Sequence, residues 1–168
     1  MRTLLIGGVP AVVFVVVTLA ACGGSSSSST SEQTTQRQAN LYSIDQVEKN
    51  FHKATSKHDI ELMMSLWAPN ATFTTSPGQT LTGKKQIRRF WLAAPVFQPA
   101  NRWVSDTAAY KIRITVNGDK GTLYFECHYI DSKTGKLGPV TAADQQVARI
   151  NGRWLITDMV GASPTLSP

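Results

Sequence analysis

Alternation of apolar and polar residues in the second half of the chain is the feature that most constrains the fold. In residues 110–116 and again in residues 123–129, every second side chain is apolar or aromatic. Successive side chains of a β-strand point to opposite faces, so each run predicts a strand with one apolar face. The turn sequences "NGDKG" and "NGR" predict hairpins. We therefore expect an antiparallel sheet whose apolar face is covered by other elements.

Two further strands complete the predicted sheet. One is expected from about Val140 to Ile150, after the turn "DSKTGKLGP", and the last in "WLITDMV". Because consecutive strands joined by short turns pair as neighbours, these four strands form an antiparallel meander. Two shorter strands are expected earlier in the chain, around the Pro-Gly turn of "ATFTTSPGQTLTG".

Helical spacing of apolar residues dominates the part of the chain before the sheet. Ser43 and Gln46 form a capping-box pattern that opens a helix with apolar positions at 44, 47, 51 and 54. A second helix is expected from Asp59, with a stripe that reaches Trp67 and is stopped by a proline. A third is expected over residues 84–94. Three helices before a curved antiparallel sheet that wraps them make an α+β domain.

The N-terminus is predicted to be a targeting segment. Arg2 precedes an almost wholly apolar run at residues 4–19, which is short for a membrane span and typical of a secretory signal. The quartet Leu19-Ala20-Ala21-Cys22 then resembles a bacterial lipobox. The resemblance implies cleavage after residue 21 and a diacylglyceryl anchor on Cys22, on the extracytoplasmic side of the bacterial cell membrane. The alternative is an uncleaved helical anchor with an incidental cysteine.

Domain boundaries follow from composition. Residues 22–40 contain no large apolar side chain after the cysteine, so we expect a flexible Gly/Ser/Thr-rich tether. The folded domain is expected over residues 41–162, with a disordered tail at 163–168. If Cys22 is lipidated, Cys127 has no disulfide partner, and its place in a strand predicts a buried, inert thiol.

The charge of the chain is basic but not concentrated. The formal net charge is +6, from 17 Lys and Arg against 11 Asp and Glu. No long block of like charge occurs, which argues against a nucleic-acid partner. One basic cluster stands out on the third predicted helix, where like charges stack at helical spacing: Lys84, Lys85, Arg88 and Arg89. We expect a solvated face there; the alternative is contact with anionic lipid headgroups or cell-wall polymer.

The run "DIELMMSLWAPNATFTTSPGQTLTGKKQIRRFW" and the closing "NGRWLITDMV" resemble the SnoaL-like, nuclear transport factor 2-like domains. The resemblance covers nearly all of residues 41–160. It implies a sheet curled into a cone around an apolar pocket, capped by helices and often paired as a dimer through its outer face. It implies little about chemistry, because this fold carries isomerases, cyclases, dehydratases and non-catalytic domains.

Comparison with the ketosteroid isomerase branch argues against its proton-transfer chemistry. That branch uses an Asp base with a Tyr and a protonated Asp as oxyanion partners. By alignment of the motifs, the Tyr position falls on Phe51 and the base position on Thr75, neither of which can play the part. The third position falls on Asp144, or on Gln146 after a two-residue slip.

Other acid–base groups remain candidates. His128 and Asp144 flank a turn and are candidates for a cross-strand acid–base pair, although alternation favours an outer-face position for His128. Asp158 is a candidate pocket acid on the last strand. His52 and His58 lack partners at metal-ligand spacing, so we expect no metal, and no cofactor motif is present.

Three functions follow from these observations. The first is a tethered domain that binds a small apolar or amphipathic molecule, in a pocket lined by Phe51, Trp67, Phe73, Thr75, Phe90, Trp91, Phe125, Tyr129 and Gln146. The second is an isomerase, dehydratase or cyclase that uses Asp144 or Asp158, with or without His128. The third is a dimeric assembly or interaction domain.

Overall fold

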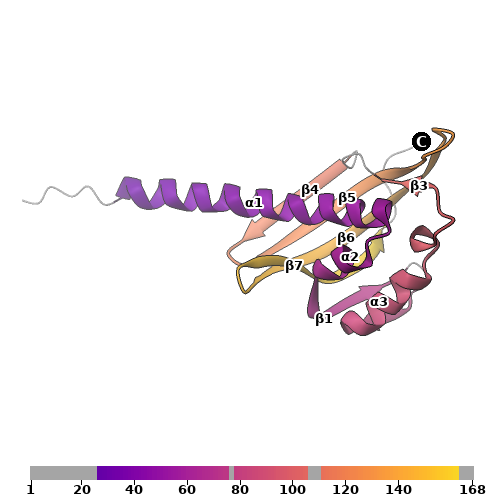
Figure 1. The fold of residues 1–168 in the computed structure, drawn as a ribbon. Coiled ribbons are helices and arrows are strands. Elements are labelled where there is room, and N and C mark those ends of the chain that lie inside the picture. The colour runs from indigo at the N-terminus through magenta and orange to yellow at the C-terminus, as the bar shows by residue number, and fades with distance from the viewer. Residues whose placement is uncertain (1–25, 76–77, 106–110, 163–168) are drawn as a thin grey trace, which may run out of the picture.

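A computed structural model describes residues 26–75, 78–105 and 111–162 (Figure 1). The helices are α1 (Ser26–Lys57), α2 (Ile60–Ser65) and α3 (Gly83–Ala93), with a 3-10 turn η1 at Pro95–Phe97. The strands are β1 (Trp67–Thr74), β2 (Thr80–Thr82), β3 (Trp103–Val104), β4 (Lys111–Asn117), β5 (Lys120–Asp131), β6 (Leu137–Ile150) and β7 (Arg153–Ala162). The predicted signal segment, Cys22 and the C-terminal tail lie outside the described residues.

The strands form a single mixed sheet in the order β2-β1-β7-β6-β5-β3, and β4 also pairs with β5. The predicted meander of β4, β5, β6 and β7 is confirmed as antiparallel. The expectation of a wholly antiparallel sheet is corrected, because β1 runs parallel to β7. Between these two strands the chain passes through α3 and the strands β3 to β6. It then returns beside β1, so that β7 runs in the same direction as β1. The two-residue β3 was not predicted.

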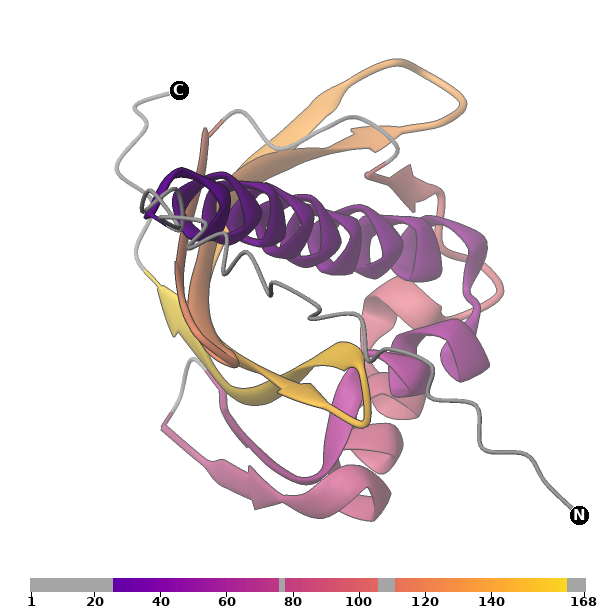
Figure 2. The ribbon, with the colours of Figure 1, turned by 90° about the vertical axis from the view of Figure 1, so that its left-hand side faces the viewer.

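The sheet curls around α1. Figure 2 shows the strands bending about the axis of this helix, which lies in the concave side, and Figure 1 shows its N-terminal part projecting beyond the sheet. The inward side chains of β5 are Leu123, Phe125 and Cys127, each at most 3% exposed, as the alternation predicts. The α+β cone expected from the sequence is therefore present.

Helix α1 begins earlier than the capping pattern indicates. The helix starts at Ser26, so residues 26–40 are helical rather than an irregular tether. Ser43 does not cap it, because its hydroxyl donates to the carbonyl of Ala39 inside the helix. Side chains 31–39 are exposed, and helix propagation from the packed part explains this extension, since each added residue needs no new nucleus.

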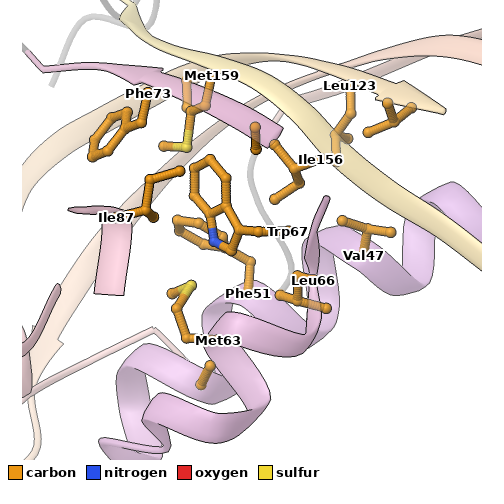
Figure 3. Packing of buried hydrophobic residues seen from close by; sticks show 14 of the residues in the cluster. Val47, Phe51, Met63, Leu66, Trp67, Phe73, Ile87, Leu123, Ile156 and Met159 are labelled. Atoms are coloured by element: carbon orange, nitrogen blue, oxygen red, sulfur yellow. The ribbon is translucent and has the colours of Figure 1, made fainter. Parts of the chain in front are cut away.

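Helix α2 is shorter than predicted because the chain turns into β1. The predicted cap at Asp59 is confirmed, since its Oδ1 accepts a hydrogen bond from Leu62 N at 2.9 Å. The helix ends at Ser65, however, and Trp67 begins a strand instead of closing the helical stripe. Trp67 is fully buried and lies among side chains from α1, α2, α3 and β7 (Figure 3). The apolar stripe thus identified a core residue but assigned it to the wrong element.

No helix within the described residues is long and apolar enough to cross a membrane. The apolar run of residues 4–19 falls outside that range, so its predicted role as a signal is not tested by the structure.

Gly121 of β5 lies in close contact with both β4 and α1. A Cβ placed on it would lie 2.5 Å from the carbonyl oxygen of Thr115 and 3.0 Å from Cδ1 of Ile44. We expect Gly121→Ala to lower the free energy of unfolding by about 1–3 kcal/mol, since backbone cannot yield as a flexible side chain would. Urea unfolding measures the change. The control is Thr122→Ser, on the opposite face; an unchanged midpoint for Gly121→Ala would contradict this packing.

Candidate functional site

An apolar pocket of about 380 Å³ opens between α3, β1 and β7. Its lining consists of Phe73, Thr75, Gln79, Phe90, Trp91, Ala94, Met159 and Gly161. A volume of this size is within the range of small-molecule sites, which are mostly apolar with a few placed polar groups. We call this cavity the apolar pocket.

Three aromatic rings form one wall of the apolar pocket. Phe73 and Trp91 stack with ring centroids 5.8 Å apart and planes 5° from parallel. Phe90 meets both rings edge-on, at 4.9 Å from Phe73 and 5.3 Å from Trp91. Offset and edge-to-face pairs of this kind hold rings more firmly than area burial alone, so the wall is pre-formed.

Polar groups at the apolar pocket are few, and none of its eight lining residues has a titratable side chain. The Thr75 hydroxyl donates to the carbonyl oxygen of Gln79 at 3.3 Å. The indole N–H of Trp91 is buried and finds no acceptor among the described residues. A buried donor without a partner costs free energy, which a ligand that accepts the hydrogen bond would recover.

A second cavity of about 680 Å³ lies beside the first. It is a more polar hollow on the outer side of α3 and β2, lined by Gln79, Leu81, Thr82, Lys85, Gln86, Arg89, Phe90 and Ala93. We call it the basic groove. Gln79 and Phe90 line both cavities, so the apolar pocket and the basic groove adjoin each other.

The predicted basic cluster is divided between two sides of α3. Arg88 forms an ion pair with Glu61 of α2, and this pair holds the pKa of the Glu61 carboxyl below its ordinary value. Lys84 lies beside Glu61 in a cavity between α2 and α3. Lys85 and Arg89 instead line the basic groove. The four cations therefore do not form one solvated face: Arg88 is paired with an acid, and Lys85 and Arg89 line a cavity.

A buried polar cluster joins α1 to the inner face of the sheet. Glu48, His52 and Cys127 are each at most 3% exposed. His52 Nδ1 lies 2.8 Å from Glu48 Oε1, and Cys127 Sγ lies 3.3 Å from the Thr141 hydroxyl. These residues line neither the apolar pocket nor the basic groove. An acid, an imidazole and a thiol are the groups of a nucleophilic site, but a thiol this deeply buried has the environment of a structural cysteine.

The buried cluster favours a charged imidazole. Burial opposes the positive charge most strongly, but the interactions of His52 with Cys127 and Glu48 outweigh it and raise the pKa of His52 to about 9. Burial likewise raises the pKa of the Cys127 thiol, but the interaction with His52 outweighs it and leaves that pKa below its ordinary value. Opposite charges in contact explain both directions.

Asp144 and Gln146 do not line the cone. Both are exposed, whereas their neighbour Gln145 is 1% exposed and faces inward. The pairing of β6 with β5 sets Leu123 opposite Gln145 and Tyr124 opposite Asp144, and partners across a ladder share a face. The inward position in β6 is therefore one residue away from both predicted alternatives, and a His128–Asp144 pair is excluded because His128 is opposite Val140.

Asp158 lies on the outer face because β7 is irregular. The pairing of β6 with β7 skips Thr157, which inserts an extra residue between Ile156 and Asp158. A bulge of this kind reverses the alternation, so Asp158 leaves the Ile156 side, and Met159 turns inward instead. The Asp158 carboxylate accepts a hydrogen bond from the Thr72 hydroxyl.

His128 is half-buried on the outer face, as alternation favours, with Nδ1 2.8 Å from the carbonyl oxygen of Gly138. His58 directly follows α1, has a positive φ, and has Nε2 3.4 Å from Asn101 Nδ2. Neither histidine lines the apolar pocket or the basic groove.

The aromatic residues predicted for the pocket are divided between its wall and the core beneath it. Phe73, Thr75, Phe90 and Trp91 line the apolar pocket. Phe51 lies behind Trp91, at a centroid distance of 5.5 Å, and Phe125 lies 5.7 Å behind Phe51. Trp67 is in the core, and Tyr129 is half-buried, with burial raising its pKa to about 12.

Sequence reasoning missed several lining residues and the buried cluster. Met159 and Gly161 reach the apolar pocket only after the β7 bulge, for which the sequence gives no clear signal. Gln79 and Ala94 lie next to a predicted turn and at the end of a predicted helix, but neither pattern assigns them to a pocket. The buried cluster did have a signal in the sequence. Glu48 and His52 lie four and eight residues after Ile44, on the same face of α1 as the apolar stripe. A charged residue inside such a stripe indicates a buried partner.

The fold and its pocket place the protein in the class of cone-shaped α+β domains with a helix-capped cavity. The chain belongs to the SnoaL-like domain family, whose model matches residues 47–155. No curated protein matches its sequence.

Solved structures share the fold at low sequence identity. A nuclear transport factor 2-like protein with a cystatin-like fold from Novosphingobium aromaticivorans is 16% identical, with a TM-score of 0.71, covering 86% of this chain and 94% of its own. A putative dehydratase of the same family from Streptomyces avermitilis is 17% identical, with a TM-score of 0.61, covering 77% and 99%. A ketosteroid isomerase-like protein from Erwinia carotovora atroseptica is 15% identical, with a TM-score of 0.54, covering 74% and 97%.

Titration of His52 tests the buried cluster. We expect its imidazole NMR signals to change with a midpoint near pH 9 and Glu48→Gln to lower that midpoint, because the carboxylate that favours the charged form is lost. The raised pKa means that the stabilising contribution of charged His52 is complete below about pH 6.5 and is lost as the pH rises through about 9. A midpoint below 6.5 in the unmodified protein would refute the ion pair.

Proposed function

We propose that this protein is a membrane-tethered, extracytoplasmic domain that binds a small apolar or amphipathic molecule in the apolar pocket. The observation that carries the proposal is the lining: three packed aromatic rings, Ala94 and Met159 surround a cavity of about 380 Å³. Transfer of apolar surface from water into such a site is favourable, at about 25 cal/mol per Å² buried. Membership in a family whose fold often encloses a pocket supports the same proposal.

We prefer a binding function to a catalytic one because of the side chains that line the apolar pocket. Among the described residues that line it, Thr75 and Gln79 alone carry side-chain hydroxyl or amide groups, and neither serves as an acid or a base near neutral pH. The predicted acids Asp144 and Asp158 lie on the other face of the sheet. The likeness to a putative dehydratase and an isomerase-like protein rests on fold, which carries no reaction with it.

The proposal that the domain is tethered to a membrane rests on the sequence. The lipobox-like quartet that ends at Cys22 supports a diacylglyceryl anchor, and the length of α1 gives the domain a stem between that cysteine and the sheet. A homodimer through the outer sheet face stays a prediction.

Filling the apolar pocket with a larger side chain should weaken binding. We expect Ala94→Phe to weaken binding of a neutral apolar probe such as Nile red at least about tenfold, because the new ring occupies the space that the probe needs. Fluorescence titration of the chain from residue 22 onward, carrying Cys22→Ser, measures the affinity.

The matched control for the filled pocket is Ala39→Phe. Ala39 is an exposed alanine on α1, away from α3, so it adds the same ring to a helix surface without touching the cavity. Equal binding by Ala94→Phe and Ala39→Phe would refute the pocket as the binding site.

Lipidation is tested with the intact precursor. Expressed in a bacterial host with an alkyne-labelled fatty acid, the unmodified chain is expected to carry the label in the membrane fraction. Cys22→Ser should lose the label, because no thiol remains to accept the lipid, whereas Cys127→Ser should keep it. A label retained by Cys22→Ser would contradict the anchor.

A further inference from the structure

We infer that the ligand is an amphiphile with an anionic head: its apolar part occupies the apolar pocket and its negative charge lies over Lys85 and Arg89 in the basic groove. This inference rests on the proposed function and narrows it to one ligand class. It follows from the placement of two cavities of opposite character on the same side of α3.

The two cavities are continuous through shared side chains. Gln79 and Phe90 line both, so a molecule longer than the apolar pocket has a direct path from it into the basic groove. Phe90 also packs edge-on against Phe73 and Trp91, so one ring of the aromatic wall is also part of the groove lining. The junction therefore has an apolar side and, at Gln79, an amide that can hydrogen-bond to a headgroup.

The cations of the basic groove are not neutralised. Among the described residues, neither Lys85 nor Arg89 forms an ion pair, whereas Arg88 on the same helix is paired with Glu61. Lys85 and Arg89 are four residues apart, so their charges are neighbours on one helix face and repel each other. A bound anion between them would relieve that repulsion and gain two attractive interactions.

The remaining groups of the basic groove fit a charged oxygen headgroup. Gln86 lines the groove and its Oε1 accepts from the backbone N–H of Thr82 at 3.1 Å, which orients its amide. None of the described residues that line the groove is acidic. Lysine and arginine are the side chains that bind carboxylate and phosphate oxygens, so the groove selects an anion over a neutral or cationic head.

The test compares two ligands that differ only in the head. Decanoate and decanol, both below the concentrations at which they aggregate, are titrated by calorimetry into the chain from residue 22 onward, carrying Cys22→Ser. Decanol reports the apolar pocket alone. We expect decanoate to bind about three- to tenfold more tightly than decanol at low salt, since ion pairs at exposed side chains add only modest attraction. Added salt should reduce this preference by screening.

Variants assign the preference to the basic groove. Lys85→Gln with Arg89→Gln is expected to remove the preference for decanoate and leave decanol binding unchanged, because both side chains lie outside the apolar pocket. Arg88→Gln is the matched control: it removes one positive charge from the same helix but one that Glu61 already pairs, so the preference should persist.

The outcomes separate the two proposals. Equal affinities for decanoate and decanol, or a preference that survives the double variant, would overturn the anionic head and leave the apolar pocket as proposed. A preference lost equally in Arg88→Gln would also overturn it, because net charge rather than the groove would be responsible. Failure of both ligands to bind would overturn the proposed function and this inference together.

Discussion

The packing of Trp91 is the interaction on which both the core and the cavity depend. Its ring stacks on Phe73 of β1, meets Phe51 of α1 edge-on, and lies 5.8 Å from Phe97 of η1. Through these contacts one side chain of α3 holds the helix against the first strand and against the helix inside the sheet. Trp91 and Phe73 also line the apolar pocket. The cavity therefore keeps its shape for the same reason that the domain stays folded, and a pre-formed site costs little ordering on binding.

Much of the fold could be predicted because it rests on local periodicity. Alternation in β5 correctly assigned Leu123 and Phe125 to the inner face, and the Asp59 cap located the start of α2. What could not be predicted depends on partners distant in sequence. The face of Asp144 is set by pairing with β5, and that of Asp158 by a bulge opposite β6. A one-residue change in either register moves an acid from one face to the other, and composition does not encode it.

The candidate site shows the same division. Phe73, Phe90 and Trp91 could be expected at the cavity because motif and helical spacing place them, whereas Met159 reaches it only after the β7 bulge. Charged side chains near the site also differ in whether they have a partner. Glu48 and His52 in the core lie against each other as an ion pair, whereas Lys85 and Arg89, which form no ion pair among the described residues, lie in the basic groove beside the apolar pocket. A buried ion pair stabilises little by itself. The cations of the basic groove are the basis of the proposed anionic head.

The most direct test of the central claim is native mass spectrometry of the protein recovered from its own host. The chain from residue 22 onward would be secreted there with Cys22→Ser, so that no anchor lipid adds mass, and ionised gently. The account predicts a population carrying an extra mass that leaves on activation and whose fragments are those of a small amphiphile, and predicts that Ala94→Phe carries none. A chain that shows only its own mass, or an adduct retained equally by Ala94→Phe, would contradict the claim that the apolar pocket is a binding site.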